Sequence, residues 1–522
     1  MGFGASRLDV RLVPAALVSW IVTAAGIVWP IGNVCALCCV VVALGGGALW
    51  WCVARRSWHA PRLGSISAGL VAVGMVGAGY GLAVALRSEA VDRHPITVAF
   101  GTSALVTVTP SESPVSLGRG RLMFRATVQR LRDDETSGRV VVFARALDFG
   151  ELMVGQPVQF RARISRPARH DLTVAVFNAT GRPTVGRAGP VHRAAHIVRH
   201  RFAAAVREVL PADQATMLPA LVLGDTSTVT ALTSREFRAA GLTHLTAVSG
   251  ANVTIVCAAA LVSARLIGPR AAVVCAAVAL VAFVILVQPT ASVLRAAVMG
   301  AIALVGMLSA RRRQAIPALS GSVLVLLAAA PHLAVDIGFA LSVAATGALV
   351  VIAPVWSRRL VDRGCPKVLA DALAVAAAAQ LVTAPLVAAI SGRVSLVAVV
   401  ANLAVAAVIA PITVLGSVAA VLVVPWPAGA QVLIRFTGPE VWWVLRVAHW
   451  RRCARGDRSG GRRSARRTAG RWRHRVHGCA VALALVSRGH VQNDGGGRHM
   501  SACLVAVRAG RPFVTPSWGE RG

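Results

Sequence analysis

The sequence predicts a polytopic α-helical membrane protein with a small extracytoplasmic β-domain. The chain has 522 residues, of which 56% are hydrophobic, and its mean hydropathy of +0.66 exceeds that of ordinary soluble domains. Many uncharged stretches have the length of about 18 to 23 residues that a helix needs to cross a bilayer. Residues 88–188 instead alternate apolar and polar side chains, which is typical of strands.

Apolar stretches with few charged residues are expected to form membrane helices both before and after this β-domain. They cover residues 12–31, 34–53, 64–86, 247–267, 271–288, 291–310, 315–331, 337–355, 368–390 and 394–424. The last stretch is long enough to contain a break at Pro411. A weaker apolar segment at 428–450 carries charges and is expected at the membrane interface.

The placement of arginine predicts the topology. Arg7 and Arg11 precede the first stretch and Arg55 follows the second, whereas the link between these two stretches has no charge. By the positive-inside rule, the N-terminus lies in the cytoplasm and the segment after Arg87 lies outside. Later loops rich in arginine alternate with loops poor in it, which continues the same topology.

The β-domain is expected to be a small barrel or sandwich of short strands separated by turns. The strands are expected within RLMFRATVQRL, GRVVVFARAL, QPVQFRARIS and LTVAVFNA, and DDETSG is expected to be a turn. In VQFRARI the apolar side chains point one way and the polar ones the other. The apolar set is Val158, Phe160, Ala162 and Ile164, and the polar set is Gln159, Arg161 and Arg163.

A basic amphipathic helix is predicted at 191–210, a pattern that often lies on a membrane surface. Its apolar positions are Val191, Ala194, Ala195, Val198, Phe202, Val206 and Val209. Its polar positions include His192, Arg193, His196, Arg199, His200 and Arg207.

Net charge and cysteine usage say little about partners. The net charge is +34, almost all of it arginine, with Lys367 as the only lysine. This bias suggests GC-rich coding DNA, so charge alone is weak evidence for a nucleic-acid partner. The cysteines at 35, 38 and 39 lie within an apolar stretch without partners at ligand spacing, so no metal site and no cofactor are expected.

The segment after Trp450 has no apolar periodicity and is rich in arginine and glycine. It is either a basic tail or an out-of-frame translation of GC-rich DNA. The second reading is favoured because disordered tails usually carry more Ser, Pro, Glu or Lys. In either case residues 451–522 are not expected to contribute to the fold.

The segment LPALVLGDTSTVTALTSREFRAAGLTHLTAVSGANV resembles the competence domain of ComEC-type proteins, the DNA-uptake channels of the bacterial inner membrane. The matching residues are Leu223, Gly224, Asp225, Ser227, Phe237, Gly241, Leu242, His244, Leu245, Ser249 and Gly250. Further matches follow in the family's order, at Pro289, Ser292, Arg295, Met299, Gly338, Phe339, Leu341, Ser342, Gln380, Thr383, Pro385, Asn402 and Pro411.

This resemblance implies a domain order and a function. The expected domains are N-terminal membrane helices (1–87), an OB-like β-domain (88–188), an amphipathic helix and re-entry segment (189–246), a channel domain (247–450) and the tail (451–522). The implied function is import of single-stranded DNA across the cytoplasmic membrane during natural transformation, with other DNA-uptake proteins as possible partners. No His-x-His-x-Asp-His run occurs, so the metallo-β-lactamase-like nuclease domain of many relatives is not expected.

Polar side chains in apolar surroundings are the candidates for the DNA path, because such groups are costly within a membrane. They are Arg295, His244, Ser249, Asn252, Asp225, Gln380 and Asn402. Arg295 has two candidate partners, a phosphate group and Asp336, and snorkelling of its side chain to the outer interface is the alternative. Packing between helices is the alternative role for Ser249, and a bond to a nearby carbonyl is the alternative for His244.

Arginines on the β-domain are candidates for contacts with a DNA backbone. They are Arg125, Arg130, Arg161 and Arg163, and a solvated strand face is the alternative reading of the same pattern.

Two other functions fit parts of the pattern. A transporter for a smaller solute would need no DNA contact, and inverted repeats would support it. An intramembrane hydrolase would use Ser249, His244 and Asp225, but the chain has no Gly-x-Ser-x-Gly elbow and the order and spacing of the three residues match no known triad.

We predict that Ser137→Cys reacts with a membrane-impermeant maleimide in intact spheroplasts, since the topology places the β-domain outside. The wild-type chain, which has no cysteine between residues 88 and 243, is the control. Labelling of Ser137→Cys only after lysis would reverse the topology.

Overall fold

The computed structural model describes residues 9–29, 31–55, 61–150, 152–246, 248–288, 291–308, 315–391 and 397–455. The segment predicted as a basic tail therefore lies outside the described residues beyond Arg455.

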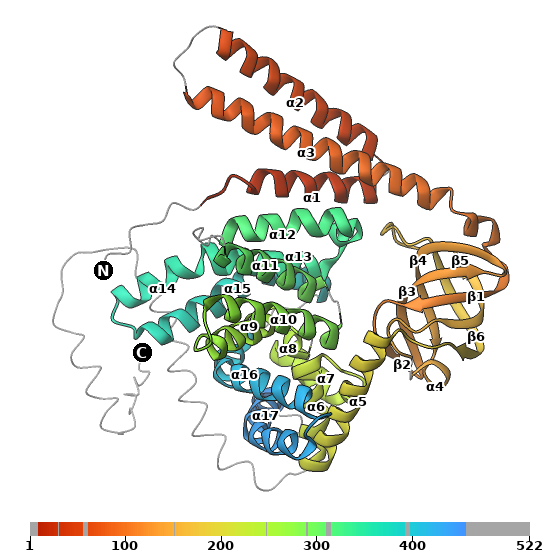
Figure 1. Ribbon diagram of the computed structural model, residues 1–522, viewed down its shortest axis with the longest axis vertical. Coiled ribbons are helices and arrows are strands. Elements are labelled where there is room, and N and C mark those ends of the chain that lie inside the picture. Colours follow the sequence, from red (N-terminus) through yellow and green to blue (C-terminus); the bar gives the residue numbers. More distant parts are fainter. Residues whose placement is uncertain are drawn as a thin grey trace, which may run out of the picture. The chain divides into compact units, whose positions relative to one another are not determined.

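Three helices form the N-terminal part of the chain (Figure 1). They are α1 (Val13–Val28), α2 (Gly32–Arg55) and α3 (Pro61–Asp92). Helices α2 and α3 pack closely because α3 presents glycine to α2. A methyl group on Gly74 would lie 2.7 Å from the carbonyl oxygen of Cys39, and one on Gly81 would lie 2.9 Å from Ala36. Small residues at such contacts let two helix backbones approach.

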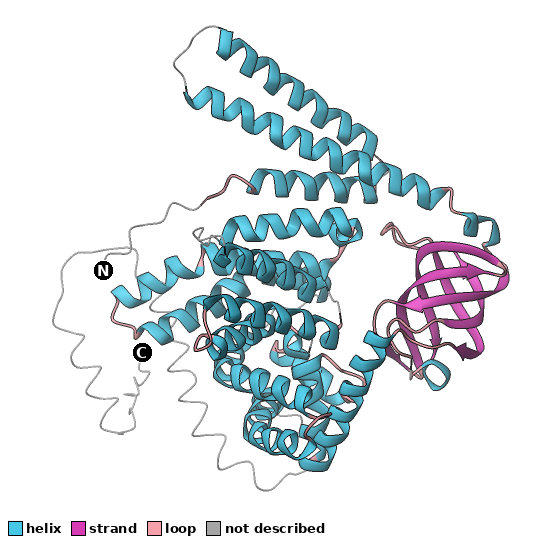
Figure 2. Ribbon diagram, in the orientation of Figure 1, coloured by secondary structure: helices cyan, strands magenta, loops and turns pink. Residues whose placement is uncertain are grey.

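All strands of the described residues lie between Ser103 and Val185 (Figure 2). They follow the short helix η1 (Pro95–Ala99). They are β1 (Ser103–Pro110), β2 (Val115–Gly118), β3 (Arg121–Leu131), β4 (Asp134–Arg145), β5 (Val158–Ser165) and β6 (Ala175–Val185). The strand order is β1-β5-β6-β4-β3-β2, and β1 also pairs with β3. The five longer strands thus close into a small barrel, consistent with the expected OB-like domain.

The strand predictions are confirmed in part. Strand β5 buries Val158, Phe160, Ala162 and Ile164 and exposes the polar residues between them. Strands β1 and β2 were not predicted, and in β1 an exposed Leu105 interrupts the apolar alternation. A turn does separate β3 and β4, but it is shorter than the predicted DDETSG and begins one residue earlier.

The β3–β4 connection shows the reason. Leu131 pairs with Asp134, so only Arg132 and Asp133 form the loop, and Arg132 takes the positive φ of 57° that tight hairpins require. The remaining polar residues of DDETSG stand on the strand β4.

The barrel has its own apolar core between its strands and the short helix α4 (Ala146–Phe149). The Phe149 ring packs edge-on against Phe160 with ring centroids 5.2 Å apart. The ring centroid of Phe124 lies 6.4 Å from that of Phe149. Such aromatic contacts add to the free energy gained by apolar burial.

Helices form the remainder of the described chain. They are α5 (Pro190–Val209), α6 (Ala212–Leu223), α7 (Ala231–Ala240), α8 (Thr243–Thr246), α9 (Gly250–Ala264), α10 (Pro269–Val287), α11 (Ala291–Leu308), α12 (Ala315–Ala329), η2 (Pro331–Val335), α13 (Ile337–Val351), α14 (Ala353–Asp362), α15 (Lys367–Ser391), α16 (Val397–Leu422) and α17 (Pro427–Arg455).

Among the described residues, six helical stretches are long and apolar enough to cross a membrane. They are Gly32–Arg55, Leu63–Ala99, Pro269–Val287, Ile337–Asp362, Lys367–Ala389 and Ala398–Leu422. Four shorter apolar helices also coincide with predicted stretches, at Val13–Val28, Gly250–Ala264, Ser292–Met307 and Ala315–Ala329. The protein is therefore a multi-pass membrane protein.

The break expected at Pro411 is wrong, because α16 continues through this residue. The hydroxyl group of Thr413, two residues further, donates to the carbonyl of Ile409 at 2.8 Å.

Helix α5 buries its apolar face within the protein. Phe202 and Val206 are fully buried in a core formed with α6, α16 and α17. The weak apolar segment expected at 428–450 is α17, and it contributes Ile434, Val441 and Leu445 to the same core. The apolar face of α5 therefore packs against helices rather than against lipid.

The short helix η2 lies close to charged groups of the β-domain. Burial lowers the pKa of His332 to about 3, and the positive charges of Arg139 and Arg125 act in the same direction. His332 is therefore neutral at neutral pH. On the other side of η2, the Trp20 indole of α1 donates to the carbonyl of Ala334 at 2.8 Å.

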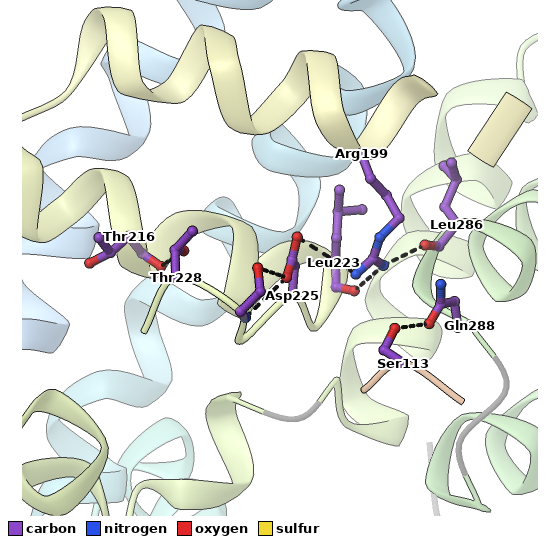
Figure 3. A network of polar contacts seen from close by, with 9 residues as sticks. Ser113, Arg199, Thr216, Leu223, Asp225, Thr228, Leu286 and Gln288 are labelled. Atoms are coloured by element: carbon purple, nitrogen blue, oxygen red, sulfur yellow. Dashed lines mark hydrogen bonds and ion pairs between the residues drawn. The ribbon is translucent and has the colours of Figure 1, made fainter. Parts of the chain in front are cut away.

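Arg199 of α5 joins the ends of two further helices (Figure 3). Its guanidinium donates to the carbonyl of Leu223, the last residue of α6, at 2.9 Å and to the carbonyl of Leu286 in the last turn of α10 at 2.8 Å. It also lies 3.8 Å from a carboxylate oxygen of Asp225. The last carbonyls of a helix lack partners within the helix, and a cation there is favourable.

The helical spacing predicts Arg199 on the solvated polar face of the amphipathic helix. In the structure, the side chain is instead nearly buried. The Arg199 side chain is only 10% exposed. Burial lowers its pKa and Asp225 opposes that change. Arg199 thus serves as a cap for neighbouring helices, not as a solvated charge.

We predict that Arg199→Met destabilises the protein, because two helix ends lose a charged donor. Each hydrogen bond to a charged group contributes about 1.5–3 kcal/mol. The thermal midpoint of the purified protein in detergent should fall by several degrees. Arg201→Met, on the exposed side of the same helix, is the matched control. Equal midpoints for the two variants would rule out this capping role.

Candidate functional site

Arg295 lies in the first part of α11 and is only 6% exposed. Its Nε donates to the hydroxyl of Ser342 on α13 at 2.8 Å, and one terminal nitrogen lies 3.3 Å from the sulfur of Met299. Met299 follows four residues later on the same helix, where i and i+4 side chains meet. The Ser342 hydroxyl in turn points to Ser292 at 3.4 Å.

Gly250, the first residue of α9, completes this arrangement. A methyl group on Gly250 would lie 2.9 Å from a terminal nitrogen of Arg295. Only glycine at position 250 therefore allows the guanidinium to keep its present position. Motif residues that are far apart in the sequence thus meet around one cation.

Among the described residues, no carboxylate lies within 4.0 Å of the Arg295 guanidinium. Asp336, one of its two candidate partners, caps α13 instead and accepts from the backbone N–H of Phe339 at 2.8 Å. The contacts of Arg295 are therefore a hydroxyl and a thioether, which leave its charge without a counterion. A buried arginine in such surroundings is costly unless an anion or water compensates it.

Ser249 and Asn252 lie at the beginning of α9. Asn252 is buried and its amide donates to the carbonyl of Leu221 at 3.3 Å. The Ser249 hydroxyl points to the side-chain oxygen of Asn252 at 3.4 Å and makes no capping bond to α9. Both side chains line a cavity of about 10 Å³ together with Thr413, which is near the lower limit for holding one water molecule.

The structure brings some of the sequence candidates together and separates others. Ser249 and Asn252 contact each other, and the adjacent Gly250 contacts Arg295. Asp225 lies in the Arg199 network, where it also accepts from the hydroxyl of Ser227 at 2.6 Å.

The remaining candidates for the path lie apart from this group. His244 lies beside the backbone of Gly241. Gln380 is half-buried on α15. The side-chain oxygen of Asn402 on α16 is buried without a hydrogen-bond partner among the described residues.

The sequence analysis gave no role to Ser292, Met299 and Ser342, although it named all three as family matches. Met299 could have been found from its i+4 spacing to Arg295. Ser342 could not, because no sequence rule places α13 beside α11.

The β-domain arginines divide into two pairs. Arg125 is paired with Glu112 at 3.1 Å and Arg130 with Glu135 at 3.1 Å. Arg161 and Arg163 are exposed on β5, and no carboxylate lies within 4.0 Å of either one in the described part of the chain. Of these four candidate arginines, only the second pair offers uncompensated charge to a polyanion.

The three residues of a conceivable hydrolase have separate partners. Ser249 contacts Asn252, His244 contacts Gly241, and Asp225 contacts Ser227 and Arg199. Within the described ranges, no hydrogen bond or ion pair joins any two of Ser249, His244 and Asp225. No cluster of three or more His, Cys, Asp or Glu side chains suited to a metal ion occurs in those ranges either.

Comparison with known families gives a match for the helical region that follows the barrel. The sequence model of the family described as Competence protein matches residues 221–456. This match begins in α6 and ends after α17, so it includes the helices that surround Arg295. Neither a curated protein nor a solved structure matches the chain. Residues 221–456 of the chain thus match the competence protein family.

Proposed function

We propose that this protein is a channel that passes single-stranded DNA inward across the cytoplasmic membrane during natural transformation. The observation that carries the proposal is the buried Arg295, which has neutral partners and no carboxylate within 4.0 Å among the described residues. The match to the competence family supports a role in DNA uptake.

The surroundings of Arg295 suit a phosphate group in transit. A guanidinium keeps its charge at every physiological pH and can bind a phosphate with two parallel hydrogen bonds. Arg295 also stands beside the first residue of α9, where the helix dipole favours an anion. Its present partners, Ser342 and Met299, are uncharged, so an arriving phosphate has no carboxylate to displace.

The β-domain would bind DNA before it enters the channel. Arg161 and Arg163 alternate on one exposed strand, and Leu105 opposite Arg161 is 47% exposed. Basic strand faces with exposed apolar side chains are suited to single strands, whose backbone they track and whose bases they contact. We place this domain outside the cytoplasmic membrane, following the distribution of arginine in the loops.

We predict that Arg295→Gln lowers DNA transport at least tenfold, because the buried charge is lost while the hydrogen-bonding shape is kept. Labelled single-stranded DNA is offered to liposomes that contain the full-length chain, with an imposed potential that is positive inside. Nuclease-protected DNA is then measured. Gly250→Ala should also reduce transport, since it displaces the guanidinium, and Arg265→Gln in an exposed loop is the control.

Two outcomes would contradict the DNA channel. If Arg295→Gln and Arg265→Gln transport equally well, Arg295 does not line the path. If wild-type liposomes release phosphate or chloride but never protect DNA, the protein transports smaller anions, which is the alternative function.

We predict that the double variant Arg161→Gln and Arg163→Gln weakens binding of single-stranded DNA by the full chain and lowers its salt dependence. Each lost phosphate contact should reduce the slope of log K against log salt by roughly 0.7, hence by about 1.4 for both. Fluorescence anisotropy measures both quantities. The matched control replaces Arg125 and Arg130, which are paired with carboxylates. An equal effect of both double variants would show that the unpaired arginines have no special role in DNA binding.

A further inference from the structure

We infer that a groove between α1, α3 and α12 binds one membrane phospholipid with an anionic headgroup. The groove has a volume of about 300 Å³. Its lining is almost entirely apolar and includes Met75, Gly79, Val84 and Leu327. This site is distinct from Arg295 and does not depend on the proposed DNA transport.

The length and direction of the groove suit an acyl chain. Met75, Gly79, Ala83 and Arg87 follow one face of α3 at four-residue spacing, so the groove extends for about 18 Å along the helix. Half of a bilayer's hydrocarbon core is about 15 Å thick. The groove lies within a stretch of α3 that is long and apolar enough to span the membrane, and Met75 is 60% exposed along its open side.

Arg87 supplies the complementary charge at one end of the groove. Both terminal nitrogens of Arg87 lie 3.2 Å from the carbonyl oxygen of Ala328, near the end of α12. The guanidinium has five donors, and no carboxylate lies within 4.0 Å of it among the described residues. It follows the apolar part of α3 and precedes the β-domain, which is the level of a phospholipid headgroup.

The closed side of the groove is held in shape by a polar contact. The hydroxyl of Tyr80 donates to the carbonyl of Leu324 on α12 at 2.5 Å. Thr23 of α1, which also lines the groove, donates to the carbonyl of Ser19 at 2.6 Å. The polar groups of these lining residues are thus already satisfied, and the surface left for the ligand is apolar up to Arg87.

Glycine substitutions on α3 allow a matched test. A Cβ atom on Gly79 or on Gly69 would have no neighbour within 4 Å, so both positions accept a larger side chain. Gly79 lines the groove and Gly69 does not. Gly79→Trp should therefore fill the groove without disturbing helix packing, and Gly69→Trp is its control.

The experiment is native mass spectrometry of the full-length protein equilibrated with equal amounts of phosphatidylglycerol and phosphatidylcholine that share the same acyl chains. The wild type should retain one phosphatidylglycerol. Retention should fall at least fivefold in Gly79→Trp and stay unchanged in Gly69→Trp. Arg87→Gln should still bind a lipid but lose the preference for phosphatidylglycerol, whereas Arg93→Gln, whose native arginine pairs with Glu89 at 2.7 Å, should keep it.

Equal retention by Gly79→Trp and the wild type would overturn the site. An unchanged preference for phosphatidylglycerol in Arg87→Gln would overturn the assignment of the headgroup.

Discussion

The need to satisfy backbone carbonyls where helices end or bend in an apolar environment organises this protein. A carbonyl without a donor is costly there because water does not reach it. Side chains from distant segments supply the donors. Arg199 serves α6 and α10, Arg87 serves α12, and the Trp20 indole serves Ala334 of η2 at 2.8 Å. Each contact fixes one helix against another, so the same hydrogen bonds satisfy the carbonyls and determine the arrangement of the helices.

Arginine plays three different roles in the molecule, and its partners decide which one applies. On the β-domain, Arg125 and Arg130 have carboxylate partners and contribute little net charge. At helix ends, Arg199 is held by carbonyls and one carboxylate. Arg295 is buried with a hydroxyl and a thioether. The same side chain therefore stabilises the fold in two settings and presents uncompensated charge in the third.

The sequence predicted the helices and most of the barrel because both depend on local periodicity. The long apolar stretches coincide with helices, and the alternation in β5 gives the buried side chains correctly. Strand β1 was not predicted, and its exposed Leu105 interrupts an otherwise regular alternation. The roles of Arg199 and Ser342 depend on which helices become neighbours in the fold. The local pattern of a single sequence does not show this.

The candidate site was predictable only in its central residue. Arg295 stands out as a charge within an apolar stretch, which is a local property. The division of the candidate β-domain arginines into paired and unpaired ones was not predictable, since Glu112 in the β1–β2 connection meets Arg125 of β3. Asp336 was a plausible partner of Arg295 by composition, yet its position before α13 favours a backbone cap.

Helix α3 has a mechanical consequence. It is one uninterrupted helix of 32 residues, about 48 Å long, and it begins beside α2 and ends just before the barrel. A continuous helix resists bending, so a force on the barrel cannot be absorbed at a hinge within α3. A pull on the barrel must instead tilt or rotate the whole helix. This movement is transmitted to α1, α2 and α12, which pack on α3.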